Sequence, residues 1–347
     1  MTPHRKGPPI DFETGRVDLS HGGGGRAMAQ LVDELFVAAF DNDMLRQRND
    51  QASFAVEAGR MVMTTDGYVI SPLFFPGGDI GSLAVHGTIN DVAMAGAVPL
   101  ALSAAFIIEE GLPLADLQRI VLSMAAASRQ ARVPVVTGDT KVVEKGKGDG
   151  LFIATSGIGR VPVGVTISGD LARPGDAILL SGTIGDHGVA VMSQRESLGF
   201  ETTLKSDSAA LHDLVAAMVA AYPSIRCLRD PTRGGLATTV NELADQSAVG
   251  MLIRESAIPL RPEVQGACEL LGLDPLYVAN EGKLVAIVPG AEADGLLAIM
   301  RAHPLGRDAA VIGTVVEDDH QFVQMETSFG GNRVVDWLAG EQLPRIC

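Results

Sequence analysis

The chain has 347 residues, 46% of them hydrophobic and 20% charged, which is long and apolar enough for two globular domains. Its formal net charge of −15 argues against a nucleic-acid groove or an anionic membrane surface, because both need clustered Lys and Arg. The N-terminus has basic residues but no apolar run behind them, so we expect a cytoplasmic protein without a secretory signal or membrane anchor.

Residues 1–44 are rich in Gly and Pro and are expected to form an extension ahead of the first domain. They contain SHGGGGR, followed by a helical stretch, AMAQLVDELFVAAF. The glycines Gly22, Gly23, Gly24 and Gly25 can present backbone N–H groups to phosphate, but a Walker loop would also need Lys and Ser/Thr. Two interpretations stay open: a flexible linker, or a lid that orders over bound phosphates.

The first domain is expected over residues 45–163. GRMVMTTDGYVI has strand-like residues on both sides of an Asp-Gly, which predicts a hairpin of two strands. The following segments alternate between helix (DIGSLAVHGTINDVAMAGA and PLADLQRIVLSMAAASRQA) and strand (PLALSAAFIIE, VPVVTG and DGLFIATSGIGRV). The uncharged stretch from Val92 to Ile108 is interrupted by Pro99, so it indicates a helix end, a turn and a buried strand rather than a membrane span.

The second domain is expected over residues 164–325. LARPGDAILLSG restarts the cycle, with helices predicted at about 187–199, 208–221 and 235–247 and strands near 250, 284 and 311. The fold class is therefore α/β. Residues 326–347 form a predicted flexible tail, in which Gly340 and Pro344 disfavour a helix. The seven residues after Gly340 could extend over roughly 23 Å.

The sequence has three cysteines, and none belongs to a C-x-x-C pair, which argues against a disulfide framework or a cysteine zinc site. Cys227 and Cys268 lie in apolar surroundings and are expected to act as small hydrophobes. Cys347 differs because it is the last residue of the tail. No histidine spacing indicates zinc, and Asp186, beside His187 at a predicted helix start, is interpreted as a helix cap.

Four aspartates of the first domain stand where a strand or loop meets a turn: Asp66, Asp79, Asp91 and Asp139. Mg²⁺ prefers oxygen ligands and usually joins one or two carboxylates to substrate phosphates, so the set predicts a metal-nucleotide site. Each alone would be read as a turn or cap residue.

Other charged residues could act on an anion or a proton. Lys141 follows Asp139 closely and could reach the same phosphates, although strand-edge lysines are usually solvated. Glu281, in NEGKLVAIV, could face the cleft between the domains or pair with Lys283. In RDPTRGGL, Asp230 and Arg233 precede a helix, as a helix start or an anion clamp.

Together these segments resemble the HypE family, the hydrogenase-maturation carbamoyl dehydratases of the aminoimidazole ribonucleotide synthetase (PurM-like) superfamily. The resemblance covers nearly the whole chain. It rests on SPLFFPGGDIGSLAVHGTINDVAMAGA, VTGDTKVVEKG, SGTIGDHG, RDPTRGGL, NEGKLVAIV and the terminal PRIC, which is the most specific of them.

The resemblance implies a two-domain PurM-like fold whose N-terminal domains pair into a shared β-barrel, giving a homodimer. It also implies Mg·ATP and a reaction on Cys347. The carbamoyltransferase HypF loads the thiol, ATP-driven dehydration turns the thiocarboxamide into a thiocyanate, and the cyanide passes to an iron scaffold of HypC and HypD. Catalysis is assigned to Cys347, Lys141 and Glu281, with either of the last two as the base. Expected nucleotide contacts are Gly22 to Gly25, Thr65, Asp66, Asn90, Gly138, Asp139 and Lys141, and Asp230 and Arg233 would position the tail.

Three rival interpretations stay open. A selenophosphate synthetase would need a cysteine or selenocysteine near the N-terminal arm, where this chain has none. A thiamine-phosphate kinase would explain the aspartates but not the terminal Cys347. A non-enzymatic carrier would explain the thiol but not the aspartates and Lys141.

Overall fold

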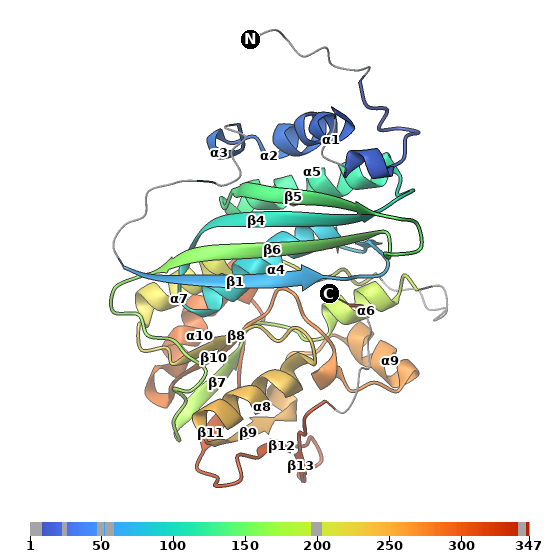
Figure 1. Cartoon of the computed structure of the whole chain (residues 1–347). Helices are drawn as coiled ribbons and strands as arrows, with labels where there is room; N and C mark the ends of the chain where they lie inside the picture. Colours follow the sequence, from blue (N-terminus) through green and yellow to red (C-terminus); the bar gives the residue numbers. More distant parts are fainter. Residues whose placement is uncertain are drawn as a thin grey trace.

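The described chain forms two large β-sheets and one small two-stranded sheet, and Figure 1 shows the two large sheets one above the other. The computed structural model describes residues 9–22, 26–46, 52, 59–195, 203–338 and 345–346. Gly23 to Gly25 and Cys347, to which the sequence assigns a lid and the reacting thiol, lie outside the described residues.

The first sheet has the strand order β1-β6-β4-β5, with β4 and β5 parallel and the other neighbours antiparallel. Helices α4 (Ile80–Met94) and α5 (Leu114–Ala131) lie behind it in Figure 1, and the face toward the viewer carries no helix of the described chain. The elements are β1 (Arg60–Tyr68), β2 (Phe74–Phe75), β3 (Gly78–Asp79), α4 (Ile80–Met94), β4 (Val98–Glu109), α5 (Leu114–Ala131), β5 (Val135–Val143) and β6 (Leu151–Val161).

The hairpin predicted at Asp66-Gly67 is wrong. β1 runs straight through both residues, which pair with Thr155 and Ala154 of β6. Gly67 is not among the described residues with positive φ, whereas a tight two-residue hairpin turn needs one. Because β6 offers a continuous ladder to the whole segment, sheet pairing overrides the local turn preference.

The N-terminal segment packs on the first domain. Its elements are the 3-10 turn Leu19–His21, α1 (Arg26–Leu31), a π-helix (Val32–Val37), α2 (Ala38–Phe40) and α3 (Asp43–Arg46). Leu31, Leu35 and Phe36 are buried in the core shared with the first sheet. The ring of Phe36 lies 4.8 Å from that of Phe106 on β4, so the helical stretch predicted here covers part of the domain.

The second sheet has the order β13-β12-β9-β11-β7-β10-β8. Its strands are β7 (Asp176–Leu180), β8 (Cys227–Arg229), β9 (Gly250–Arg254), β10 (Val285–Pro289), β11 (Ala310–Val316), β12 (Val323–Glu326) and β13 (Asn332–Val334). The helices are α6 (Asp186–Met192), α7 (His212–Ala221), α8 (Gly235–Ser247), α9 (Pro262–Leu271) and α10 (Ala293–Ala302). The sheet thus extends into residues that the sequence assigned to the tail, because Val335 is fully buried in this domain's core.

Helix α4 lies at the junction of the two domains. It is apolar on nearly every side, as expected of a helix buried all round, and it contacts β1, β6, α5 and α7. The uncharged stretch Val92 to Ile108 contains the end of α4 and the start of β4, as predicted. None of the helices in the described ranges has the length and apolar character needed to cross a bilayer.

Candidate active site

The inner face of β1 carries the first part of the site. Side chains alternate along a strand, so Thr64, Asp66 and Tyr68 point together toward α4. The Thr64 hydroxyl donates to Asp91 Oδ2 over 2.7 Å, and the Tyr68 hydroxyl donates to Asp66 Oδ2 over 3.0 Å. A pair of hydroxyls therefore fixes a pair of carboxylates where β1 meets α4.

Acidic side chains from both domains meet at this place. Asp66, Asp91, Asp230 and Glu281 line one pocket, together with Tyr68 and Thr232. The first three also line a wider cleft of 640 Å³ between the domains, which is within the size range of small-molecule sites. The fold thus brings together carboxylates that are more than 200 residues apart in the sequence.

Glu281 is the most deeply placed of the four. Its side chain is buried, and Oε1 has no hydrogen-bond partner among the described residues. The sequence left open a pairing with Lys283, which is wrong: Lys283 Nζ lies 2.8 Å from Asp207 Oδ2 instead. Asp207 also accepts from the Glu281 backbone N–H over 3.1 Å, so the loop is rigidly held while the Glu281 carboxyl stays available.

Burial and mutual repulsion raise the pKa values of three of these carboxyls, Asp91, Asp230 and Glu281. The pKa of Asp91 rises to about 6 through burial and then the charge of Asp66, and that of Asp230 rises to about 7 through burial and then Asp91. The pKa of Glu281 lies well above its ordinary value, through burial first and then the charge of Asp230. Near neutral pH the free site therefore keeps bound protons, which an incoming cation would displace.

Arg233 brings positive charge to the rim. It is exposed, lines both the pocket and the cleft, and forms no ion pair among the contacts of the described chain. The RDPTRGGL segment is also a helix start, because Gly234, with φ 76°, is the N-cap of α8. The helix-start interpretation is therefore confirmed, and the Arg233 guanidinium lies at the cleft.

Asp79 does not join the acidic cluster. It caps α4, accepting from the backbone N–H groups of Gly81 (2.8 Å) and Ser82 (3.1 Å), and is buried there. Asn90 is likewise occupied: its amide donates to the carbonyls of Ala209 and Glu281 and accepts from the Leu211 N–H. Asp79 therefore starts a helix and Asn90 joins the two domains, a correction to the metal and nucleotide roles assigned to them.

Asp139 and Lys141 lie far from the cluster within one chain. They form an ion pair, Nζ to Oδ2 2.8 Å, on β5. β5 and β1 are opposite edges of the sheet, about 14 Å apart at the usual strand spacing. Following the strand pairings across the sheet, Asp139 stands at the same position as Gly67 and faces the same side. Neighbouring residues of a strand face opposite sides, so Asp66 and Asp139 point to opposite faces of the sheet. The four predicted metal aspartates do not form one group in a single chain.

Two further nucleotide candidates also lie away from the acidic pocket. Thr65 points to the uncovered face and donates to the Thr155 carbonyl over 3.0 Å. Gly22 lies against β5, where a Cβ would come within 2.5 Å of the Val142 backbone nitrogen. Gly22 is therefore beside Val142, the neighbour of Lys141 on β5.

The cap assigned to Asp186 is wrong. Gly185, with φ 83°, is the N-cap of α6, and its lack of a side chain leaves Asp186 free to turn into the domain. There Asp186 accepts from the Thr183 hydroxyl (2.6 Å) and from Arg261 Nε (3.2 Å). It therefore holds two loops of the second domain together.

The described end of the tail reaches the same region of the molecule. Ile346 is buried in the core of the first domain and forms a β-bridge with Ile70, two residues beyond Tyr68. The two other cysteines, Cys227 and Cys268, are buried free thiols, as predicted, and burial raises the pKa of each to about 11.

Oxygen donors of the acidic pocket suit a hard divalent cation, and the Glu281 Oε1, left without a partner in the described ranges, indicates an incompletely satisfied site. Within the described ranges, no three His, Cys, Asp or Glu side chains are already arranged around a single point. A magnesium ion bridged by phosphate oxygens needs only one or two protein carboxylates, so the residues fit that mode of binding.

Sequence reasoning missed Thr64, Tyr68 and Asp207. The period of two along β1 would have placed Thr64 and Tyr68 beside Asp66, but the assumed hairpin at Asp66-Gly67 interrupted that pattern. Asp207 carried no local signal, because its partners come from a loop 74 residues or more further along the chain.

Comparisons with known proteins agree with this architecture. Residues 48–161 match the family model of the AIR synthase related protein N-terminal domain, and residues 173–326 match that of its C-terminal domain. Fold and site therefore define a two-domain protein of the AIR synthase related class. Carbamoyl dehydratase HypE of Cupriavidus necator is 71% identical over 98% of this chain and 97% of its own length.

Two solved structures extend the comparison. A hydrogenase maturation protein HypE in complex with ATP is 51% identical, with a TM-score of 0.91 over 95% of this chain and 99% of its own. A HypE–HypF complex contains a chain that is 49% identical, with a TM-score of 0.78 over 89% of this chain and 99% of its own. The chain belongs to the HypE family of carbamoyl dehydratases.

Proposed function

We propose that this chain uses Mg·ATP to dehydrate a carbamoyl group carried on its own terminal residue, Cys347. The observation that carries this proposal is that the end of the tail docks beside the strand whose Tyr68 lines the same pocket as the buried carboxyl of Glu281. Ile346 docks two residues beyond Tyr68, whose hydroxyl binds Asp66 in the same pocket. The relatives named as carbamoyl dehydratases and the ATP-bound relative support the same reaction.

The reaction balances as thiocarboxamide plus ATP giving thiocyanate, ADP, phosphate and a proton. The carboxamide oxygen attacks the γ-phosphorus and ADP leaves, while one N–H proton is lost. Loss of the second N–H proton then expels phosphate and forms the C≡N bond. An amide oxygen is a poor leaving group and phosphate is a good one, so ATP supplies the driving force.

Glu281 is the proposed base. Burial raises its pKa, which makes the ionised carboxylate a stronger base, and among the described residues no donor occupies Oε1. Asp66 and Asp91, with Asp230 beside them, would hold Mg²⁺ against the phosphates, and the metal would neutralise charge during transfer. Arg233 would bind phosphate or tail at the rim.

Lys141 is the rival base, and in one chain it cannot meet Glu281. We propose that Lys141 of one subunit meets Glu281 of the other in a homodimer, since a two-fold axis can bring the β5 edge of one sheet to the β1 edge of the other. The uncovered face supports pairing: Met61 is 40% exposed, Met63 74% and Ile107 40%. An apolar sheet face of this kind is expected to be covered in solution. Asp139, Gly138 and Gly22 to Gly25 would then complete the nucleotide site from a second copy.

The proposed partners follow from the carrier role of the tail. A HypF-like carbamoyltransferase would load Cys347, and an iron scaffold of HypC and HypD would receive the cyanide. The relative solved in complex with HypF supports the first of these.

The test uses the full chain carbamoylated at Cys347. Addition of Mg·ATP should remove one water from the mass of the C-terminal peptide, and Cys347→Ala should abolish the change. No ATP-dependent loss of water would refute the dehydratase, and a loss that survives Cys347→Ala would place the reacting group elsewhere.

The dimer has a separate test. Lys141→Ala and Glu281→Gln, each inactive alone, should on mixing recover up to about a quarter of wild-type activity, because half of the dimers contain one intact site. No recovery, despite subunit exchange, would mean that the two residues do not serve one site across copies.

A further inference from the structure

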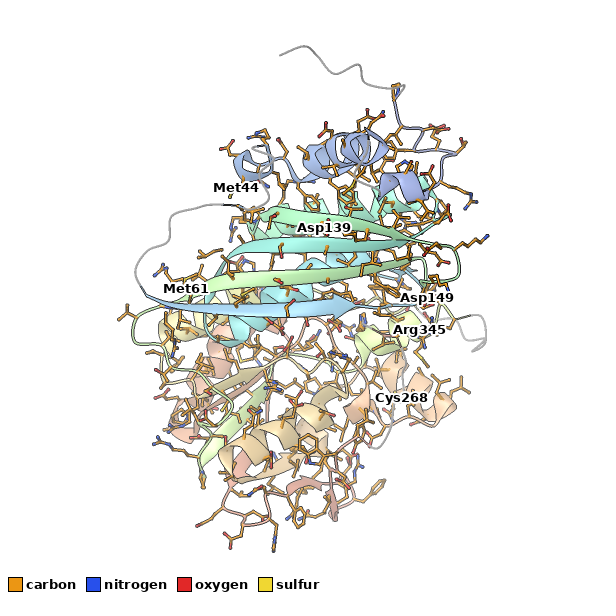
Figure 2. The ribbon with its side chains drawn as sticks, viewed as in Figure 1. Met44, Met61, Asp139, Asp149, Cys268 and Arg345 are labelled. Atoms are coloured by element: carbon orange, nitrogen blue, oxygen red, sulfur yellow. The ribbon has the colours of Figure 1, made fainter. Side chains whose placement is uncertain are left out.

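The end of the tail is held by a set of contacts that the reaction chemistry does not use. Arg345 and Ile346 lie between a loop of the first domain and helix α6 of the second, and Figure 2 shows Arg345 beside Asp149. The Arg345 carbonyl accepts from the Ser71 N–H (3.2 Å) and from Arg195 Nη2 (3.0 Å). Arg345 also forms an ion pair with Asp149.

His187 makes the deepest of these contacts. It is fully buried, and its Nε2 lies 2.8 Å from the Ile346 carbonyl oxygen, while Nδ1 lies 2.8 Å from Ser206 Oγ. The carbonyl oxygen can only accept, so Nε2 carries the proton and donates. Ser206 Oγ accepts from the Ser208 N–H, which leaves its own proton free to donate to Nδ1. Both ring nitrogens are satisfied by a neutral imidazole in one tautomer.

The ring itself is fixed by packing. Phe75 meets His187 edge-on, with centroids 5.4 Å apart and planes at 86°. Burial lowers the pKa of His187, which keeps the imidazole neutral at physiological pH. Arg195 is fixed as well, because its Nε donates to the Ser71 carbonyl over 3.1 Å. The Arg195 guanidinium therefore donates both to the Ser71 loop and to the tail, and it holds the two together.

We propose that His187 and Arg195 are positioning residues that latch the tail main chain and so set how often the terminal thiol lies inside the molecule. Both residues contact backbone carbonyls of the tail, as in strand addition, and the Ile346 side chain is buried in the apolar core of the first domain. Asp149 adds a surface ion pair, which contributes little because both side chains are about half exposed. The inference rests on the proposed function only in taking Cys347 as the reacting group.

Such weak docking suits a thiol that must react inside the molecule and also be reached by partners outside it. Few hydrogen bonds hold the described end of the tail, and each is worth only a small factor in the docking equilibrium. The docked state is thus favoured but reversible, as needed if a carbamoyl donor and a cyanide acceptor are to reach the same thiol outside.

Thiol alkylation tests the latch without ATP or a carbamoyl group. The full chain is treated with iodoacetamide, and modification of Cys347 is followed by the mass of the C-terminal peptide. Cys227 and Cys268 are buried and serve as internal controls for folding. His187→Ala and Arg195→Ala should each speed alkylation of Cys347 about fivefold, the factor that one net hydrogen bond is worth.

His187→Gln should restore slow alkylation in part, because its amide N–H can still donate to the Ile346 carbonyl. Asp213→Asn, which breaks an exposed ion pair with Arg132 far from the tail, should leave the rate unchanged. If His187→Ala also exposes Cys227, that variant has lost its fold and does not test the proposal. Arg195→Ala then provides the test, because the Arg195 side chain lies at the edge of the core. Unchanged alkylation of Cys347 in a folded Arg195→Ala variant would overturn the proposal.

A second readout separates positioning from a purely structural role. In single-turnover dehydration of the carbamoylated chain, the latch variants should slow the step several-fold while the ATP concentration for half-maximal rate stays the same. A changed ATP dependence with an unchanged maximal rate would assign these residues to nucleotide binding instead. Failure of the dehydration itself, with alkylation as expected, would count against the proposed function and leave the latch standing.

Discussion

Replacement of Asp230 by Asn should stabilise the free protein, and the gain should depend on pH. The pKa of Asp230 is raised from 3.8 to about 7 by burial and then by the charge of Asp91. Below pH 3.8 the carboxyl is protonated in both the folded and the unfolded state, so it has no pH-dependent effect. Between pH 3.8 and 7 the unfolded chain ionises first, so the folded state loses stability as the pH rises.

The size of this loss follows from the pKa difference. At about 1.4 kcal/mol for each tenfold change in proton affinity, the upper bound is about 4 kcal/mol. Asp230 is only half-buried by surface area and lines an open cleft, so solvent screening reduces the effect to about 2 kcal/mol. Asp230→Asn should therefore be about 2 kcal/mol more stable than the wild type at pH 8 and equally stable near pH 4.

Urea denaturation at several pH values, with EDTA present to remove metal, measures this difference. Asp207→Asn should instead destabilise the protein. Burial acts to raise the pKa of Asp207, but the charge of Lys283 and its hydrogen bond outweigh burial, so the pKa is lowered. Its loss leaves Lys283 buried without a partner and should cost about 3 kcal/mol at pH 8. If Asp230→Asn is no more stable than the wild type at pH 8, the ionised Asp230 carboxylate does not destabilise the folded protein, and the reasoning from its raised pKa is refuted.

Three further outcomes are expected. Glu281→Gln should slow ATP-dependent nitrile formation at least about 100-fold with little change in ATP binding, and an unaltered rate would remove Glu281 as the base. Thr64→Val should weaken Mg·ATP binding about fivefold in a titration, because Asp91 loses its hydroxyl donor, whereas Thr65→Val on the opposite face should change it less. Met63→Glu should shift the protein from dimer to monomer in light scattering, and an intact dimer would place the interface elsewhere.

Local patterns in the sequence predicted most of the secondary structure. The apolar run of α4, the amphipathic period of α5 and the β-rich stretch of β4 each carry their own signal, and the structure confirms all three. The hairpin at Asp66-Gly67 failed for a long-range reason. A turn preference is a weak local energy, and a full ladder of pairing with β6 outweighs it.

The site was only partly predictable. Residue type marked Asp66, Asp91, Asp230 and Glu281 as candidates, and the fold gathers them in one pocket. Residue type could not separate them from Asp79, which has the same chemistry but stands at the first turn of a helix. Strand alternation and sheet order, rather than composition, decide that Lys141 points away from this pocket.

The sequence by itself determined the class of the protein and most of the order of its elements, and it singled out the terminal cysteine. These features depend on short-range periodicity and on motifs made of consecutive residues, which can be recognised without the fold. Only the tertiary structure decided which carboxyls share a pocket, that His187 and Arg195 hold the end of the tail, and that Lys141 lies on the opposite edge of the first sheet from that pocket. Such facts depend on distances between residues far apart in sequence, and burial then sets their charge and their energy.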